Sequence, residues 1–343
     1  MLNNPTKLLF LSMLMIGTLI SISSNNWISV WMGLEMNLLS FIPLMINKNN
    51  SLSTEASLKY FLIQTLSSTS LLFSIILMSI LNYSISSFFM MNNIILLIIN
   101  SSLLLKMGAA PFYFWFPEMM EGLSWNNCLI LMTWQKISPL ILISFCLMNN
   151  LILMIIFLSV MIGSIMGLNQ ISLRKLMAYS SINHLGWMLA SLISSENIFI
   201  SYFIMYSLLS FTILWMFNLF QIFQLNQIFM LTQYNYSLKF SMFISLLSLG
   251  GLPPFLGFLP KWIVIQSMID MNLIFMITIM MIMSLVTLYF YIRITYSSFL
   301  LSYNELKWMN ISNYKNNNFI FMMIFNIISI MSLFMISLLF YMY

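Results

Sequence analysis

Apolar runs of about 20 residues, the length that crosses a hydrocarbon layer roughly 30 Å thick as a helix, recur along the whole chain. Short groups of Asn, Ser, Pro and charged residues separate these runs. Only 6% of the residues are charged, whereas a soluble domain carries about a quarter. So few charges cannot cover a water-exposed surface, and the sequence therefore predicts an all-α polytopic membrane protein.

Cutting the chain at the polar groups gives about eleven predicted transmembrane segments. They are residues 8–24, 27–46, 57–81, 93–112, 125–146, 151–170, 172–195, 198–223, 239–262, 272–298 and 319–341. No soluble domain interrupts the series, so we expect residues 1–343 to form a single transmembrane domain.

Basic residues sort to one side of this predicted topology. Of the twelve Lys and Arg residues, three lie inside predicted segments and the other nine lie on the side of the N-terminus or at helix ends that face it. The opposite side carries only Glu196 and Asp270. This asymmetry agrees with the positive-inside rule and predicts that the N-terminus faces the inside and the C-terminus the outside. Because the basic residues are scattered singly, they do not indicate a nucleic-acid partner.

The chain has two cysteines, Cys128 and Cys146, and both lie in apolar surroundings. An iron–sulfur cluster takes four cysteine ligands, so two cysteines and one histidine do not provide such a site. We expect both cysteines to be buried thiols, because free cysteine is commonly buried. The sequence contains no nucleotide-binding loop or cluster motif, and we expect neither a metal site nor a cofactor-binding site in this chain.

Four predicted segments carry an ionisable residue well inside the apolar run, namely Glu35, Lys106, Lys136 and Lys261. A charge at membrane depth costs several kcal/mol unless it is paired, so such residues are rare and mark ion or proton pathways. His184, the one histidine, lies in an unusually polar part of the segment 172–195. We hypothesise that the three lysines and His184, with waters between them, form a lateral proton relay.

A carboxylate and an amine at similar depth suggest how such a relay is loaded. Glu35 and Lys106 lie at comparable depths in their segments, so an ion pair between them would satisfy both. A lysine removed from water is less stable in its charged form, and a movable carboxylate restores that stability. Lys136 has no obvious acidic partner at membrane depth, but Pro139 follows it and leaves the carbonyl of Gln135 without its usual helical donor.

The segment 239–262 is predicted to be a broken helix near residues 250–260. An unbroken helix does not accommodate its run of helix-disrupting residues, which are Gly250, Gly251, Pro253, Pro254, Gly257 and Pro260. Bilayers tolerate a broken helix only where protein or a hydrated cavity satisfies the freed backbone groups. Lys261 follows this break directly, and ionisable residues beside broken helices recur at ion sites in transporters.

Structural interpretations stay open for each of these residues taken singly. An intramembrane lysine can extend to the membrane surface or pair only to hold helices together. A buried histidine packed against Ser and Asn is common in protein cores. Glu118 and Glu121, between the segments with Lys106 and Lys136, are interpreted as interfacial loop charges outside the relay.

Six motifs occur in order along nearly the whole chain: WMGLEMNLLSFIPL, STEASLKYFL, LLLKMGAAPFYFWFPEMMEGL, MTWQKISPL, GLNQISLRKLMAYSSINHLGWM and SLGGLPPFLGFLPKW. Each is weak alone, but the ordered set closely resembles the subunit 2 family of mitochondrial NADH:ubiquinone oxidoreductase, respiratory complex I. The resemblance implies an antiporter-like inverted-repeat bundle related to cation/proton antiporters. The wider fold has additional N-terminal helices that this chain lacks, and we expect the core repeats to survive.

The resemblance also implies roles for residues that match the family motifs. The glutamate of WMGLE, Glu35, would pair with the lysine of LLKMGAAPF, Lys106. The lysine of WQKISP, Lys136, would be the central relay member, and that of FLPKW, Lys261, would lie on the exit side in a discontinuous helix. His184 corresponds to a relay histidine of the family.

The resulting hypothesis is a core membrane-arm subunit of a redox-driven proton pump in the mitochondrial inner membrane, with its N-terminus in the matrix and its C-terminus in the intermembrane space. NADH, FMN, iron–sulfur clusters and ubiquinone would be bound by partner subunits. The expected partners are other membrane-arm subunits, including neighbouring antiporter-like subunits, and membrane lipids. A stand-alone cation/proton antiporter and a structural membrane-arm spacer remain as alternatives.

Overall fold

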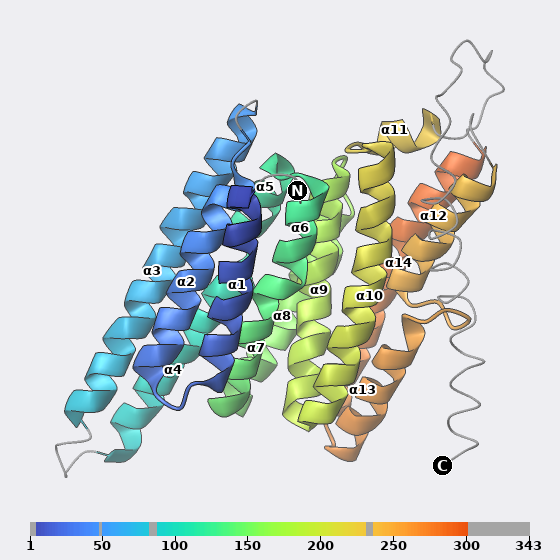
Figure 1. Ribbon diagram of the computed structural model, residues 1–343. Helices are drawn as coiled ribbons and strands as arrows, with labels where there is room; N and C mark the ends of the chain where they lie inside the picture. Colours follow the sequence, from blue (N-terminus) through green and yellow to red (C-terminus); the bar gives the residue numbers. More distant parts are fainter. Residues whose placement is uncertain (1–4, 48–49, 82–87, 231–235, 301–343) are drawn as a thin grey trace, which may run out of the picture. The chain divides into compact units, whose positions relative to one another are not determined.

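The computed structural model describes residues 5–47, 50–81, 88–230 and 236–300, and these residues form α-helices joined by short connections (Figure 1). Within these ranges the only strand-like pairing is an isolated bridge between Ser172 and Gln224. The all-α prediction is therefore confirmed. The chain groups into two compact units, Met1–Ser159 and Val160–Tyr343; the single-domain organisation stays a prediction.

The helices of the first unit are α1 (Pro5–Ser23), α2 (Trp27–Met45), α3 (Ser51–Leu81), α4 (Phe88–Met107), α5 (Trp115–Gly122), α6 (Trp125–Met132), α7 (Trp134–Phe145) and α8 (Asn149–Gly167), which extends into the second. The second unit continues with α9 (Leu173–Ser194), α10 (Glu196–Phe220), α11 (Leu225–Met230), α12 (Tyr236–Gly250), α13 (Phe258–Asp270) and α14 (Ile274–Leu300).

The predicted segments coincide with these helices to within a few residues, except where a helix is broken. Seven described helical segments are long and apolar enough to cross a bilayer. Two further apolar stretches, Asn93–Met107 of α4 and Phe240–Gly250 of α12, each end at a helix break. The predicted segment 319–341 lies outside the described residues.

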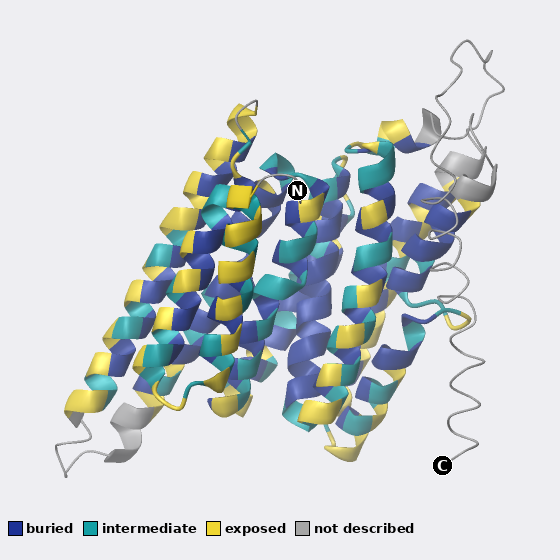
Figure 2. Ribbon diagram, in the orientation of Figure 1, coloured by how far each residue is buried: buried dark blue, intermediate teal, exposed yellow. Residues whose placement is uncertain are grey.

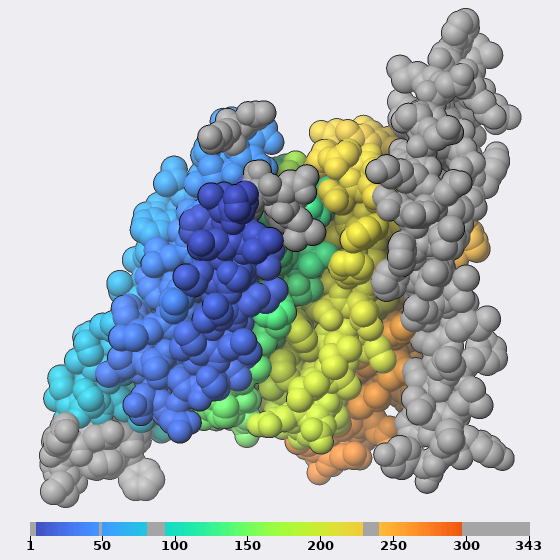
Figure 3. Space-filling view, viewed as in Figure 1, coloured from blue at the N-terminus to red at the C-terminus, as the bar shows by residue number. Residues whose placement is uncertain are grey.

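Glycines allow α1 and α2 to pack closely in the first unit, and Figure 3 shows the two helices in contact on the visible face. A Cβ atom on Gly33 would lie 2.7 Å from the backbone nitrogen of Ser21. One on Gly17 would lie 2.6 Å from the Oδ1 atom of Asn37. Small residues at such crossings let helix backbones approach within a membrane, and here they place Asn37 in the interior.

The predicted segment 93–112 is not one continuous helix, and this prediction was wrong. Helix α4 ends at Met107, Gly108 adopts a φ of 69°, and Ala109 donates its backbone N–H to the Leu104 carbonyl, at 3.1 Å. A positive-φ glycine with this bonding pattern ends a helix, and Pro111 cannot donate to continue one. The chain resumes as α5 at Trp115.

The predicted break near 250–260 is confirmed in the second unit. Helix α12 ends at Gly250, Gly251 has a φ of 86°, and α13 begins at Phe258. Helix α9 packs against α10 and α13, and Figure 2 shows it buried along most of its length. A helix with so little exposed surface suits the unusually polar sequence of residues 172–195, because its polar groups face protein and not lipid.

Candidate functional site

Lys106 lies in the last turn of α4 and is buried, so it sits at a helix end and not in the middle of a helix. The last carbonyl groups of a helix lack partners within it. The carbonyl of Lys106 accepts a hydrogen bond from Nε2 of Gln64, a buried residue of α3, at 3.1 Å. The negative end of the α4 dipole also favours a cation at this position. The helix break therefore stabilises a buried lysine.

The predicted direct ion pair between Glu35 and Lys106 is not formed. Within the described part of the chain, Glu35 of α2 makes no ion pair with Lys106, although the two interact electrostatically. The Oε2 atom of Glu35 is buried and has no hydrogen-bond partner. The α4 terminus and its dipole stabilise Lys106 without a carboxylate in contact, which explains how the two side chains stay apart.

Lys136 lies in α7 and is 1% exposed. Its Nζ atom is 5.2 Å from the ring centroid of Phe116 in α5, a distance typical of a cation–π contact. Helices α6 and α7 meet at Thr133, which interrupts what was predicted as one segment, and Pro139 lies inside α7. Lys136 is thus placed in the first turn after an interruption.

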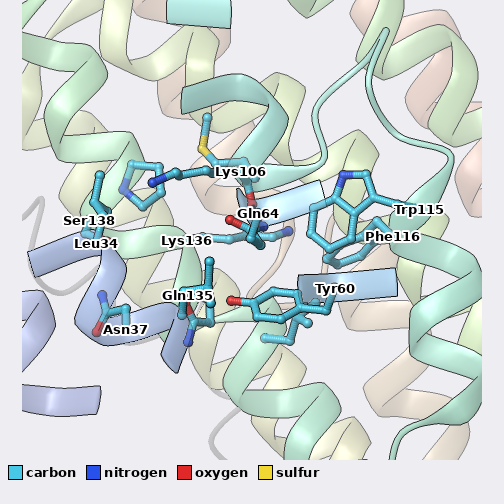
Figure 4. A pocket seen from close by; sticks show the side chains of 14 residues that line it. Leu34, Asn37, Tyr60, Gln64, Lys106, Trp115, Phe116, Gln135, Lys136 and Ser138 are labelled. Carbon is cyan, nitrogen blue, oxygen red and sulfur yellow. Dashed lines mark hydrogen bonds between the residues drawn. The ribbon is translucent and has the colours of Figure 1, made fainter. Parts of the chain in front are cut away.

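Lys106 and Lys136 line one cavity in the first unit, together with Asn37, Gln64 and Gln135 (Figure 4). The space open to the centre of a water molecule is about 20 Å³. A cavity needs roughly 10–15 Å³ of such space to hold one water, so this one has room for one or two. The structure therefore brings two of the predicted lysines to a single polar cavity.

Two amide side chains of this cavity were not predicted from the sequence. Asn37 is 2% exposed, and neither its Oδ1 nor its Nδ2 atom has a hydrogen-bond partner in the protein. The Nε2 atom of Gln135 is likewise buried without a partner. Buried amides without protein partners are rare and are commonly satisfied by ordered water. Asn37 lies two residues after Glu35, and Gln135 directly precedes Lys136. This closeness to the charged residues was the one signal in the sequence that could have identified the two amides.

Lys261 and His184 lie in the second unit and are both buried. The Nζ atom of Lys261, in the first turn of α13, donates to the carbonyl of Gly250 at the end of α12, at 2.8 Å. It also lies 5.9 Å from the ring centroid of Trp187. The Nδ1 atom of His184 is 2.9 Å from the hydroxyl oxygen of Tyr202. Lys261 thus bridges the two halves of the broken helix.

Glu118 and Glu121 belong to the short helix α5 and not to a loop. Glu118 forms an ion pair with Lys59 at 2.7 Å, and the two side chains are 57% and 49% exposed. Exposed pairs of this kind contribute about 1 kcal/mol or less to stability. Both cysteines are free and buried, as predicted. Among the described residues, no group of three or more His, Cys, Asp or Glu is arranged to hold a metal ion.

Comparison with known families covers almost the whole chain. Residues 24–287 match the model of the transmembrane region of NADH:quinone oxidoreductase and the Mrp antiporter. Residues 288–340 match the model of the NADH dehydrogenase subunit 2 C-terminus.

Relatives with established names are similar over nearly their full length. NADH-ubiquinone oxidoreductase chain 2 of Anopheles gambiae is 57% identical over 334 residues, which are 97% of each chain. The same chain of Aedes aegypti is 54% identical over 97% of each. That of Locusta migratoria is 47% identical over 90% of each.

Solved structures share the fold at lower identity. A chain of respiratory complex I from Thermus thermophilus with bound aureothin has a TM-score of 0.82 and 20% identity, over 95% of this chain and 77% of that one. A chain of the Mrp complex from Dietzia has a TM-score of 0.73 and 15% identity, over 84% of this chain and 59% of that one. The antiporter-like fold is therefore shared by both groups of membrane complexes.

Proposed function

Because this chain belongs to the subunit 2 family of NADH:ubiquinone oxidoreductase, we propose that its buried lysines transfer protons during translocation across the mitochondrial inner membrane. The chain is a core subunit of the membrane arm, and its partners are other subunits of that arm. NADH, FMN, iron–sulfur clusters and ubiquinone are assigned to partner subunits, where the redox chemistry takes place.

The observation that carries the proposal is the shared cavity of Lys106 and Lys136. Both side chains are buried, and the cavity between them has room for one or two waters beside the amides of Asn37 and Gln135. A lysine held out of water releases its proton more readily than one in solution. Water between the two amines provides an oxygen that accepts a proton from one and donates a proton to the other.

Glu35 supports the proposal as a distant charge. A carboxylate near an amine favours the charged amine, so a change in the separation of Glu35 and Lys106 would change the proton affinity of Lys106. In this structure the two are not in contact, and one carboxylate oxygen is buried without a partner. Movement of Glu35 toward Lys106 would satisfy both groups and load a proton, whereas movement away would release it.

Replacing Lys106 with glutamine tests this function in the assembled complex. We expect NADH-driven proton translocation to fall on the order of tenfold, less than the 10²-fold typical of a lost acid–base group, because Lys136 and cavity water remain. Translocation is measured in sealed vesicles per amount of assembled complex. Lys59→Gln is the matched control, since Lys59 is half exposed. If the Lys106→Gln complex translocates protons at the wild-type rate, a purely structural role for Lys106 is favoured.

The orientation proposed here puts the N-terminus in the matrix and the C-terminus in the intermembrane space. Cysteine labelling tests it, because both native cysteines are buried. In mitoplasts, a membrane-impermeant maleimide is expected to label Asp270→Cys, whereas Asn226→Cys is expected to react only after permeabilisation. Both positions are exposed, one at the end of α13 and the other in α11. The reverse labelling pattern would refute the orientation.

A stand-alone cation/proton antiporter is the second candidate, favoured by the match to the Mrp antiporter model. Two relatives with 97% mutual coverage are chain 2 proteins of NADH-ubiquinone oxidoreductase. The Mrp chain, in contrast, is covered over only 59% of its length. The complex I assignment is therefore the better supported.

A further inference from the structure

Two hydrogen bonds join helix α3 to its neighbours in the first unit, which are the helices that carry Glu35 and Lys106. The indole Nε1 atom of Trp31 in α2 donates to the backbone carbonyl of Ser68 in α3, at 3.1 Å. The Nε2 atom of Gln64 in α3 donates to the backbone carbonyl of Lys106 at the end of α4, also at 3.1 Å (Figure 4). Hydrogen bonds are directional, so they fix the placement of packed helices more narrowly than apolar contacts do.

The two bonds place Glu35 and Lys106 at the same level of the unit. Helices α2 and α3 pack against each other and are joined by the five residues 46–50, so they run antiparallel. One turn toward that connection leads from Trp31 to Glu35 on the same face of α2. On α3, one turn toward it leads from Ser68 to Gln64. Glu35 therefore lies level with Gln64, whose amide binds the carbonyl of Lys106.

The polar atoms of these two side chains are explained by the carbonyls that they bind. Gln64 is 5% exposed, and a buried amide is costly unless it makes hydrogen bonds. An apolar side chain of the same length would pack at this position without that cost. The carbonyl of Lys106 is one of the last four of α4, which lack donors within the helix. The half-buried Trp31 likewise has a donor that phenylalanine would not supply.

We propose that Trp31 and Gln64 are positioning residues that anchor α2 and α4 to α3 and so fix the distance over which Glu35 acts on Lys106. This inference rests on the proposed function, in which the separation of those two charged groups controls the loading of a proton.

The anchors determine which motion changes that separation. Helix α2 is bound to α3 one turn from Glu35, and α4 is bound at Lys106 itself, so sliding of α2 past α4 would stretch at least one of the two bonds. Rotation of the Glu35 side chain leaves both bonds intact. Its Oε2 atom has no hydrogen-bond partner within the described part of the chain that would oppose this rotation. Glu35 therefore moves toward or away from Lys106 as a side chain on an anchored backbone.

Gln64→Met and Trp31→Phe test the anchors, because each removes one donor and keeps most of the side-chain volume. We expect either change to lower NADH-driven proton translocation about threefold to fivefold per amount of assembled complex, less than the loss of an acid–base group would. The matched controls are Gln266→Met and Trp215→Phe, which we expect to translocate at the wild-type rate. Gln266 is exposed on α13, and Trp215 is 41% exposed on α10.

A double-mutant cycle distinguishes positioning from packing. In the wild-type background, Glu35→Gln is expected to lower translocation about fivefold, less than Lys106→Gln does, because Glu35 acts through that lysine. With Gln64→Met or Trp31→Phe already present, the same change is expected to cost less than about twofold, since the carboxylate is no longer fixed at the level of Lys106. A packing defect unrelated to Glu35 would leave the fivefold effect unchanged.

Two results would overturn the positioning role. One is translocation by Gln64→Met and Trp31→Phe at the rates of their controls, and the other is a full effect of Glu35→Gln in both backgrounds. The two donors lie on different helices, so if one variant fails to assemble the other carries the same test. If Lys106→Gln lowers translocation while Gln64→Met and Trp31→Phe match their controls, the positioning role fails and the proposed function stands.

Discussion

Replacing Lys136 with glutamine is expected to slow NADH-driven proton translocation by about 100-fold or more, the cost of losing a group that transfers a proton in the rate-determining step. Lys136 is 1% exposed and lines the cavity that also contains Lys106. Glutamine is one atom shorter and fills most of the same space, and its amide donates hydrogen bonds but does not carry a transferable proton at neutral pH. The cavity would keep its water and Lys106 and lose the lysine proposed as the central proton carrier.

Assembly of the complex is expected to survive this change. Burying an ammonium group costs several kcal/mol before any favourable contact is counted, and the substitution removes that cost. The cation–π contact with the ring of Phe116 is lost in exchange, and such a contact contributes about 2 kcal/mol or more when it is desolvated. Native gel electrophoresis measures assembly, and dye or electrode measurements of proton uptake in vesicles measure the function.

Changing Gly257 to alanine is expected to destabilise the second unit by about 3 kcal/mol, as overpacking of a tight contact does. Gly257 precedes α13 and has a φ of −69°, which any residue adopts, so backbone strain is not the reason. Space is the reason, because a Cβ atom would overlap the carbonyl oxygen of Ser248 in α12. The two halves of the broken helix would have to separate, which would pull Lys261 away from the carbonyl of Gly250.

Gly250→Ala provides the comparison for this prediction. The tightest contact of a Cβ atom there would be the ring of Tyr291, at 3.3 Å, while Leu288 would lie at an ordinary 3.8 Å, and a side chain gives way more easily than backbone. The thermal midpoint and yield of the purified complex should fall clearly for Gly257→Ala and little for Gly250→Ala. Equal stability of the two variants would show that the halves of the helix tolerate a wider gap.

Most of the helical architecture follows from the apolar runs, because their length must match the bilayer. The break at residues 251–257 was predictable, since six Gly and Pro residues lie within residues 250–260. The break after Met107 was not predicted, because its sequence has only Gly108 and Pro111 within a long apolar run. Its position depends on tertiary structure, including the hydrogen bond from Gln64 to the last turn of α4.

The candidate site was predictable to the extent that charge is rare in apolar segments. That rarity alone identified Lys106, Lys136 and Lys261. The amides of Asn37 and Gln135 carry no such signal, because neither side chain is charged and a cavity forms only when helices pack. The ion pair predicted between Glu35 and Lys106 is not formed in this structure, because depth in a segment does not determine whether two side chains meet.

The most direct test of the account is the number of protons translocated per NADH oxidised by vesicles that contain assembled complex with Lys106→Gln, Lys136→Gln or Lys261→Gln. We expect each variant to fall below the wild type in rate or in this ratio, whereas Lys59→Gln, whose side chain is 49% exposed, stays unchanged. If all three buried-lysine variants assemble and match the wild type in both quantities, these lysines do not transfer protons and the central claim is contradicted.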